Sequence, residues 1–244
     1  MQRLTITSAQ LQANHIQLTL EQQHYLRRVL RLQAGDRFLA LDGRGQQWLA
    51  MLTDSAATAQ LLDAVAAESV PLPQVVLAAA LPKGSGFDEV VRQATELGVT
   101  EIWPLISDRT LLRPSAQKLT RWQRIATEAA EQSERLVVPV VDEPRSFKQL
   151  LQTTAADQPL YLCSARQQQP HLLTCLLERP SAALLVATGP EGGWTTAEVN
   201  EAIAAGYQVV SLGSTVLRAV TAPLAALTLI NAVYTLKSER LKGV

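Results

Sequence analysis

Two glycine-bearing turns in the C-terminal part of the chain hold the residues whose types and spacing could do chemistry. The first reads TGPEGGW over residues 188–194, and the second reads SLGSTVLRAVTAP over residues 211–223. Each follows an apolar run typical of a buried strand and precedes a segment typical of a helix. Glycines at such a junction either make a tight turn or let a ligand approach bare backbone, and N–H groups at a helix start suit an anionic or nucleotide-like ligand. The residues alone predict a small polar ligand held by backbone, and a purely structural role stays open.

Other chemistries find less support. Neither turn has the G-x-G-x-x-G spacing of a dinucleotide site or the G-x-x-x-x-G-K-[ST] spacing of a P-loop. His171 and Cys175 are four residues apart, as two metal ligands on a helix can be, but no further His/Cys cluster is nearby. The two cysteines, Cys163 and Cys175, are too few for a disulfide scaffold. We expect both to be reduced thiols in a core, and we expect no metal ion.

The elements that must position the turns alternate between strands and helices. Predicted strands cover residues 75–81, 101–107, 160–164, 183–188 and 207–213, and predicted helices cover residues 87–98, 115–135, 196–206 and 222–239. This alternation predicts an α/β domain with a parallel sheet covered by helices on both faces. Ligands bind at the carboxyl ends of the strands in such sheets, so both glycine turns lie where a site is expected.

The first 70 residues predict a small mixed or barrel-like module. A short strand covers residues 3–6, and two further strands flank a hairpin turn at residues 42–45 (DGRG). A helix is predicted between Thr19, its N-cap, and Gly35, which ends or follows it. The apolar face of this helix would consist of Tyr25, Leu26, Val29 and Leu30.

A polar segment with two prolines divides the chain. Residues 68–74 (ESVPLPQ) are typical of a linker, which predicts domains at residues 1–70 and 74–244. Apolar residues make up 47% of the chain and charged residues 18%, as in an ordinary globular protein. No apolar stretch approaches the ~20 residues of a membrane span, and the N-terminus lacks the apolar core of a signal peptide. We therefore expect a cytoplasmic protein with no membrane partner.

Charge is balanced, with 22 Lys+Arg against 22 Asp+Glu, so a nucleic-acid partner would need local basic patches. Two clusters could supply phosphate contacts. They consist of Arg27, Arg28 and Arg31 on the predicted N-terminal helix, and of Arg109, Arg113, Lys118, Arg121 and Arg124 farther along. A solvated helix face is the alternative for either cluster. Trp103 and Trp122 could stack on bases, but we expect both to pack in the core.

The two turns together resemble the signature of the ribosomal RNA small subunit methyltransferase E family, a member of the SPOUT class. Further stretches share the resemblance: HYLRRVLRLQAGD, KGSGFDEVVRQATELGV and RWQRIATEAAEQSERLVVP. The resemblance implies a transferase that uses S-adenosylmethionine to methylate N3 of a uridine in the 16S ribosomal RNA of the small subunit. It implies a PUA-like N-terminal β-barrel and a C-terminal α/β domain that ends in a deep trefoil knot. It also implies a homodimer with the cofactor pocket near the subunit interface, and no DNA partner.

The same resemblance assigns roles to residues of the two turns. It implies that the cofactor is held by Thr188, Gly189, Gly192, Gly193, Ser211, Leu212, Gly213 and Leu217. Arg218 matches the arginine of the family's LR element and is the candidate for stabilising a uracil anion, although an arginine that only pairs locally is the alternative. Glu191 could act as a base, orient its loop, or make a structural hydrogen bond. The implied RNA contacts are Arg27, Arg28, Arg31, Arg109 and Arg113.

The second turn departs from the family pattern, which is close to LGPRILRTETA where this chain has LGSTVLRAVTA. Thr215 stands in place of an arginine and Val220 in place of a glutamate. These departures leave two other hypotheses open. The chain could be a ribosome-binding or assembly factor that kept the fold without turnover, or a methyltransferase of the same class that acts on another RNA.

Overall fold

The computed structural model describes residues 1–66, 73–152, 158–165 and 169–242. Most of the predicted linker, residues 68–72, lies outside the described residues. The chain falls into two compact units. The first comprises Met1–Ser69 and Ala130–Val138, and the second comprises Val70–Ala129 and Pro139–Val244. Nothing in the sequence pattern indicated that residues 130–138 would pack with the N-terminal module.

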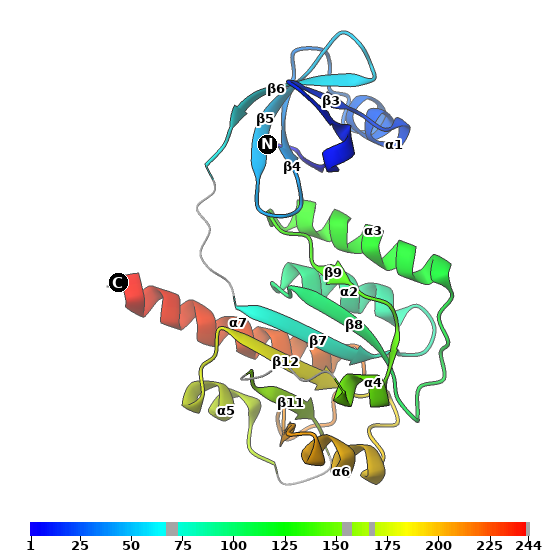
Figure 1. The fold of residues 1–244 in the computed structure, drawn as a ribbon, viewed down its shortest axis with the longest axis vertical. Helices are drawn as coiled ribbons and strands as arrows, with labels where there is room; N and C mark the ends of the chain where they lie inside the picture. The colour runs from blue at the N-terminus through cyan, green and yellow to red at the C-terminus, as the bar shows by residue number, and fades with distance from the viewer. Residues whose placement is uncertain (67–72, 153–157, 166–168, 243–244) are drawn as a thin grey trace. The chain divides into compact units, whose positions relative to one another are not determined.

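The first unit is built on a curled sheet of six short strands in the order β1-β4-β5-β6-β3-β2 (Figure 1). The strands are β1 (Arg3–Thr5), β2 (Leu11–Gln12), β3 (His15–Gln17), β4 (Arg37–Leu41), β5 (Gln47–Leu52) and β6 (Thr58–Ala64). The turn at residues 42–45 joins β4 to β5 as predicted, and these strands pair in antiparallel fashion. Alternate side chains of the strands, among them Leu4, Ile16 and Phe38, form the core of the unit.

The predicted N-terminal helix is shorter and more irregular than its sequence pattern indicates. It consists of α1 (Leu20–His24), whose N-cap Thr19 is confirmed, and a π-helical turn η2 (Tyr25–Val29). A π turn holds more residues than an α turn, which rotates the following side chains. Val29 is therefore 57% exposed instead of lying on the apolar face. The chain turns away at Arg31, with φ +59°, before it reaches Gly35.

The second unit confirms the predicted parallel sheet. Its main strands follow the order β10-β8-β7-β12-β11-β13, and β9 pairs with β8. The strands are β7 (Gln74–Ala80), β8 (Glu101–Ile106), β9 (Val140–Val141), β10 (Arg145–Ser146), β11 (Leu160–Cys163), β12 (Ala183–Thr188) and β13 (Gln208–Val210). Every pair between them is parallel. The two-residue strands β9 and β10 were not predicted, because they are too short to show a periodic pattern.

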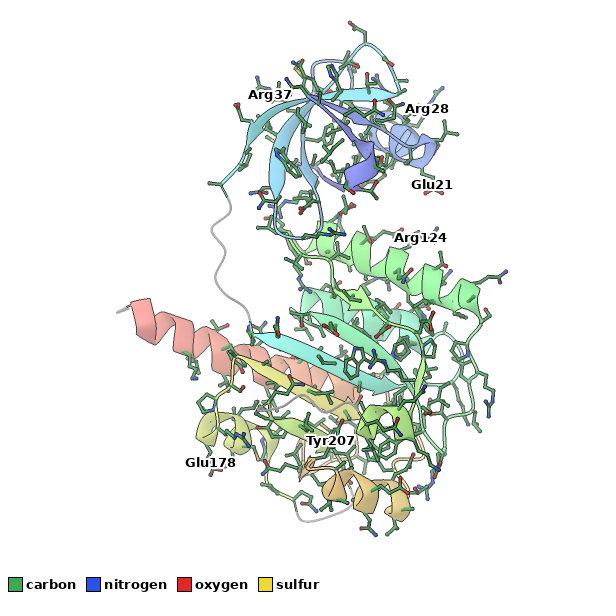
Figure 2. The ribbon with its side chains drawn as sticks, in the orientation of Figure 1. Glu21, Arg28, Arg37, Arg124, Glu178 and Tyr207 are labelled. Atoms are coloured by element: carbon green, nitrogen blue, oxygen red, sulfur yellow. The ribbon has the colours of Figure 1, made fainter. Side chains whose placement is uncertain are left out.

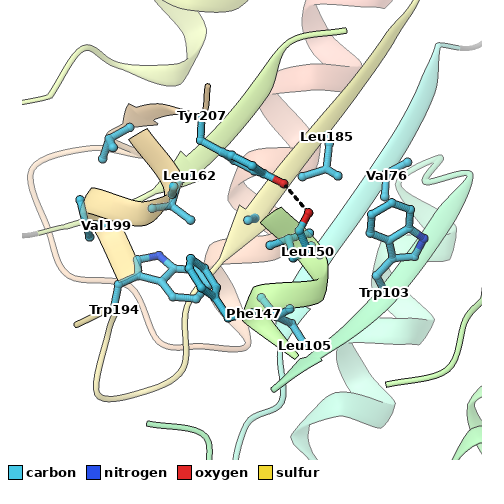
Figure 3. Close-up of a cluster of buried hydrophobic side chains, with 14 residues drawn as sticks. Val76, Trp103, Leu105, Phe147, Leu150, Leu162, Leu185, Trp194, Val199 and Tyr207 are labelled. Atoms are coloured by element: carbon cyan, nitrogen blue, oxygen red, sulfur yellow. Dashed lines mark hydrogen bonds between the residues drawn. The ribbon is translucent and has the colours of Figure 1, made fainter. Parts of the chain in front are cut away.

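Helices cover both faces of this sheet (Figure 1). They are α2 (Gly86–Glu96), α3 (Ala116–Gln132), α4 (Phe147–Leu151), α5 (Leu172–Glu178), α6 (Thr196–Ala204) and α7 (Thr221–Lys242). One face packs against α4 and α6 through a buried cluster that includes Phe147, Leu162, Leu185 and Val199 (Figure 3). Within the part of the chain that the structure describes, no helix is long and apolar enough to cross a membrane.

Helices α2 and α3 are joined by a buried carboxylate. The Asp88 side chain accepts hydrogen bonds from Arg121 Nε at 2.8 Å and from Trp122 Nε1 at 3.0 Å. Trp122 is 1% exposed and its ring contacts Phe87 edge-on, with 4.6 Å between centroids. Trp103 is also buried. Both tryptophans therefore belong to the core, as expected.

Candidate functional site

A pocket of about 210 Å³ lies at the carboxyl ends of the central strands of the second unit. Its walls come from the end of β11, the turn after β12, the start of α6, and the loop between β13 and α7. Because β11 lies between β12 and β13 in the sheet, these loops emerge side by side. The pocket thus forms where a parallel sheet is expected to bind ligands.

The structure brings residues of both glycine turns to this pocket. Of the residues implied to hold a cofactor, those that line it are Gly189, Gly193, Leu212, Gly213 and Leu217. Thr188, Gly192 and Ser211 are their chain neighbours but not part of its lining. Glu191 lines the pocket as well, whereas Arg218 does not. A direct role of these residues in cofactor binding stays a prediction.

Contacts within the chain account for the glycines of the first turn. The N–H of Gly193 donates to Pro190 O at 2.8 Å, and its φ of +68° is a conformation that side chains disfavour. A Cβ on Gly189 would lie 3.1 Å from Trp194 Cε2. A Cβ on Gly192 would lie 3.0 Å from Arg109 Cδ. The turn therefore needs its glycines for its own packing, whether or not a ligand also approaches it.

Trp194 is a pocket residue that sequence reasoning missed. Its ring lies beside Phe147 (Figure 3), with 5.2 Å between centroids. Its Nε1 donates to Cys163 O at 2.9 Å. The side chain therefore joins the end of β11 to the start of α6 and presents an aromatic wall to the pocket. Its place directly after the two glycines was the available signal, but its partners lie far away in the sequence.

Arg109 lies at the pocket, although it was predicted as an RNA contact. Its Nη1 donates to Gly192 O at 2.7 Å and to Trp194 O at 3.3 Å. Glu191 reaches in another direction, and its Oε1 accepts a hydrogen bond from Lys83 N at 2.9 Å. This contact favours the structural, loop-orienting hypothesis for Glu191 over that of a free base.

Arg218 lies at the entry to α7. Its carbonyl accepts from Thr221 N and Ala222 N, whereas its exposed guanidinium has no hydrogen-bond or ion-pair partner among the residues that the structure describes. Two residues of this loop depart from the family pattern. Thr215 lines the pocket, and Val220 packs against the start of α2. A Cβ on Gly86 would lie only 2.9 Å from Val220 Cγ1, so the position holds an apolar contact in place of a carboxylate.

The two cysteines are free and buried, as expected. Burial raises the pKa of Cys163 to about 12, so its thiol, which borders the pocket, stays protonated near neutral pH. His171 caps α5, and its Nδ1 accepts from Leu173 N at 3.2 Å. Within the described residues, no three His, Cys, Asp or Glu side chains are grouped so that they could hold a metal ion.

The predicted RNA contacts differ in their surroundings. Arg27 Nη2 donates to Thr53 O at 2.8 Å and to Ser55 O at 2.9 Å, so its guanidinium holds a loop of the first unit. Arg28 and Arg31 are exposed, and Figure 2 shows the Arg28 side chain projecting from that unit. Arg113, in the second unit, is exposed as well.

Comparisons with known proteins agree with this arrangement. A family model described as an RNA methyltransferase domain matches residues 68–231, and one described as an RNA methyltransferase PUA domain matches residues 18–62. A ribosomal RNA small subunit methyltransferase E from Synechocystis is 52% identical over 94% of this chain and 77% of its own length. The Bacillus subtilis protein of the same name is 31% identical over 100% of this chain and 99% of its own. The crystal structure of the Neisseria gonorrhoeae protein of that name, bound to S-adenosyl methionine, superposes with a TM-score of 0.85 at 33% identity, covering 97% of this chain and 98% of that one.

Proposed function

Because the chain belongs to the ribosomal RNA small subunit methyltransferase E family, we propose that it transfers a methyl group from S-adenosylmethionine to N3 of a uridine in 16S ribosomal RNA. The observation that carries the proposal is the pocket itself. The turn after β12 and the loop after β13, which carry the family signature, form opposite parts of one pocket at the carboxyl edge of the sheet.

The residues of the pocket fit an adenosyl and methionyl ligand. Trp194, Leu212 and Leu217 supply apolar surface, and the glycine turns expose backbone N–H and C=O groups that can recognise an adenine edge. Beside them, the buried Thr188 Oγ1 has no hydrogen-bond partner among the described residues, which suits a site that a polar ligand completes. When bound, the cofactor would supply an electrophilic methyl group on a sulfonium.

Arg218 would act on the uracil. Attack by N3 requires loss of the imide proton, and a guanidinium next to the ring would stabilise the resulting anion. The Arg218 side chain is free for this role because it is exposed and without a partner among the described residues. Glu191 would orient the glycine turn through its hydrogen bond to Lys83 N.

We further propose that RNA phosphates are bound by Arg28, Arg31 and Arg113, whose side chains are exposed. Arg27 would support them by holding the loop at Thr53 and Ser55. An enzyme that modifies ribosomal RNA would work where ribosomes are assembled, so we place it in the cytoplasm, with the small subunit as its partner.

Two features of α7 support the remaining proposals, a homodimer and a trefoil knot. The exposed side of α7 carries residues at four-residue spacing, namely Thr228, Ala232 and Leu236, and lies opposite the buried Ile230 and Val233. A second subunit could cover this side.

In the segment between β13 and α7, Ser211 pairs with His171, so the chain passes beside the segment that links β11 to α5. A chain that threads under that segment before it enters α7 would form the knot.

The test is transfer of labelled methyl from S-adenosylmethionine to small subunits that lack native uridine methylation, followed by nucleoside mass analysis. We expect label in 3-methyluridine. Cofactor binding without transfer to small subunits would contradict the proposal and favour the assembly-factor hypothesis. Transfer to transfer RNA alone would favour the hypothesis of another RNA substrate. Absence of both transfer and cofactor binding would mean that the glycine turns serve only the fold.

A further inference from the structure

Arg109 connects the basic loop after β8 to the glycine turn of the pocket. One guanidinium nitrogen, Nη1, donates to Gly192 O at 2.7 Å and to Trp194 O at 3.3 Å. These two carbonyls flank Gly193, whose φ of +68° lies in the left-handed region that favours glycine. A single charged side chain therefore bonds the backbone on both sides of this residue.

The stem of Arg109 makes an equally specific contact. A Cβ on Gly192 would lie 3.0 Å from Arg109 Cδ and 3.4 Å from Arg109 Cβ. The φ of Gly192 is not in the left-handed region, so its backbone does not demand glycine. A side chain there would instead press against the stem of Arg109. Arg109 and Gly192, which are 83 residues apart in the sequence, thus pack directly against each other.

A second contact joins the same two segments. Glu198, in the first turn of α6, is only 3% exposed, and its Oε1 accepts from Asp108 N at 2.9 Å. Its Oε2 accepts from Thr195 N at 2.7 Å. Residues 108 and 109 are therefore both bonded to the segment that runs from the glycine turn into α6, and Arg109 itself lines the pocket.

We propose that Arg109 is a positioning residue for the cofactor, which holds the turn at residues 189–194 in the shape that forms the pocket wall. This inference rests on the proposed function. Without the guanidinium, we expect the turn to hold that shape in only a fraction of the molecules. The apparent Kd for the cofactor then equals the intrinsic Kd divided by this fraction, so binding weakens. The effect is present without RNA, which separates it from the phosphate-binding role that the sequence pattern predicts for this arginine.

Calorimetric titration of the full chain with S-adenosylhomocysteine, the unreactive product, tests this without RNA. We expect Arg109→Met to raise Kd by about tenfold or more, in keeping with the loss of a charge-assisted hydrogen bond. Arg109→Lys should give a smaller rise, because an ammonium can still donate to the carbonyls but lacks the planar group. The matched control is Arg179→Met, which removes an exposed arginine of the same unit that lies outside the pocket and has no hydrogen-bond or ion-pair partner for its side chain among the described residues, and its Kd should stay unchanged. An unchanged Kd for Arg109→Met would overturn the inference. A wild-type chain that binds no cofactor would overturn the proposed function and the inference together.

Two further measurements show whether Arg109 acts through the turn. Hydrogen exchange of the Gly193 amide, which donates to Pro190 O, should be faster in Arg109→Met than in the wild type, with the central strands unchanged. Gly192→Ala, which presses on the arginine stem, should weaken cofactor binding by itself but add little in an Arg109→Ala background, where the stem beyond Cβ is absent. Unchanged exchange at the turn, or full additivity of the two substitutions, would contradict a positioning role.

Discussion

At the scale of single residues, side chains that bond to distant backbone shape the pocket, and one charged side chain next to the pocket lining has no such bond. Arg109, Glu191 and Trp194 each bond to backbone of another segment, and so they shape the turn after β12. Arg218 differs, because its guanidinium has no partner among the residues that the structure describes. Arg218 stands between two pocket-lining residues, Leu217 and Ala219, so we propose it as the group that acts on the substrate.

Arg218→Met should therefore impair turnover and leave cofactor binding intact. We expect kcat to fall by about 100-fold or more, the usual effect of removing a group that stabilises charge in the transition state, with Kd for S-adenosylhomocysteine within twofold of the wild type. Single-turnover methyl transfer and calorimetry measure the two quantities. Arg218→Lys should recover part of the rate. A Met variant that transfers methyl at the wild-type rate would restrict Arg218 to a structural role.

At the scale of elements, the start of α6 fixes one wall of the pocket. Thr195 and Glu198 form a capping box, in which Thr195 Oγ1 accepts from Glu198 N at 3.1 Å and Glu198 Oε2 accepts from Thr195 N. The other carboxylate oxygen, Oε1, is used by Asp108 N. This buried carboxylate thus caps the start of α6 and ties the helix to the loop after β8. The same side chain therefore stabilises the fold and fixes a wall of the pocket.

Glu198→Gln should lower the free energy of unfolding by about 1–3 kcal/mol. The glutamine amide has one acceptor oxygen, so its NH₂ group would face either Asp108 N or Thr195 N, and both of these are donors. Urea denaturation followed by far-UV circular dichroism measures the change. The matched control is Glu201→Gln, an exposed carboxylate on the same helix, which should shift stability by less than about 0.5 kcal/mol. Equal effects of the two substitutions would contradict the account of α6.

At the scale of the whole molecule, strand order decides where the site forms. The strand β11 lies between β12 and β13, so the turn after β12 and the loop after β13 flank the end of β11. The loop then leads into α7, which packs against α2, α5 and β12 and leaves Leu236 54% exposed. A second subunit on this side of α7 would place a partner next to the helix that the pocket loop enters.

Light scattering at micromolar concentration should therefore report a dimer. Leu236→Glu should shift the species toward monomer, because a carboxylate buried in an apolar interface is costly. Lys237→Glu, at the adjoining exposed position, serves as the control for the added negative charge. A wild-type monomer would contradict the dimer, and a Leu236→Glu variant that stays dimeric would mean that the interface lies elsewhere.

The sequence by itself determined the alternation of strands and helices, the parallel sheet, the hairpin at residues 42–45, the cap at Thr19 and the two glycine turns at which the pocket lies. These features are encoded by neighbouring residues, through periodicity and turn chemistry. Local pattern could not show the π turn that exposes Val29, because it depends on a shift of a backbone hydrogen bond by one residue, from Leu30 N to Tyr25 O.

Only the tertiary structure decided which distant residues meet at the pocket. Arg109 lies 83 residues before Gly192, and Cys163 lies 31 residues before Trp194, yet each pair is joined by a hydrogen bond. Strand order creates these contacts, and a sequence pattern does not encode strand order. For the same reason, the sequence could indicate only an RNA contact or a solvated helix face for an arginine in a basic run. The fold adds a contact that no sequence pattern shows: a Cβ on Gly192 would press against the stem of Arg109.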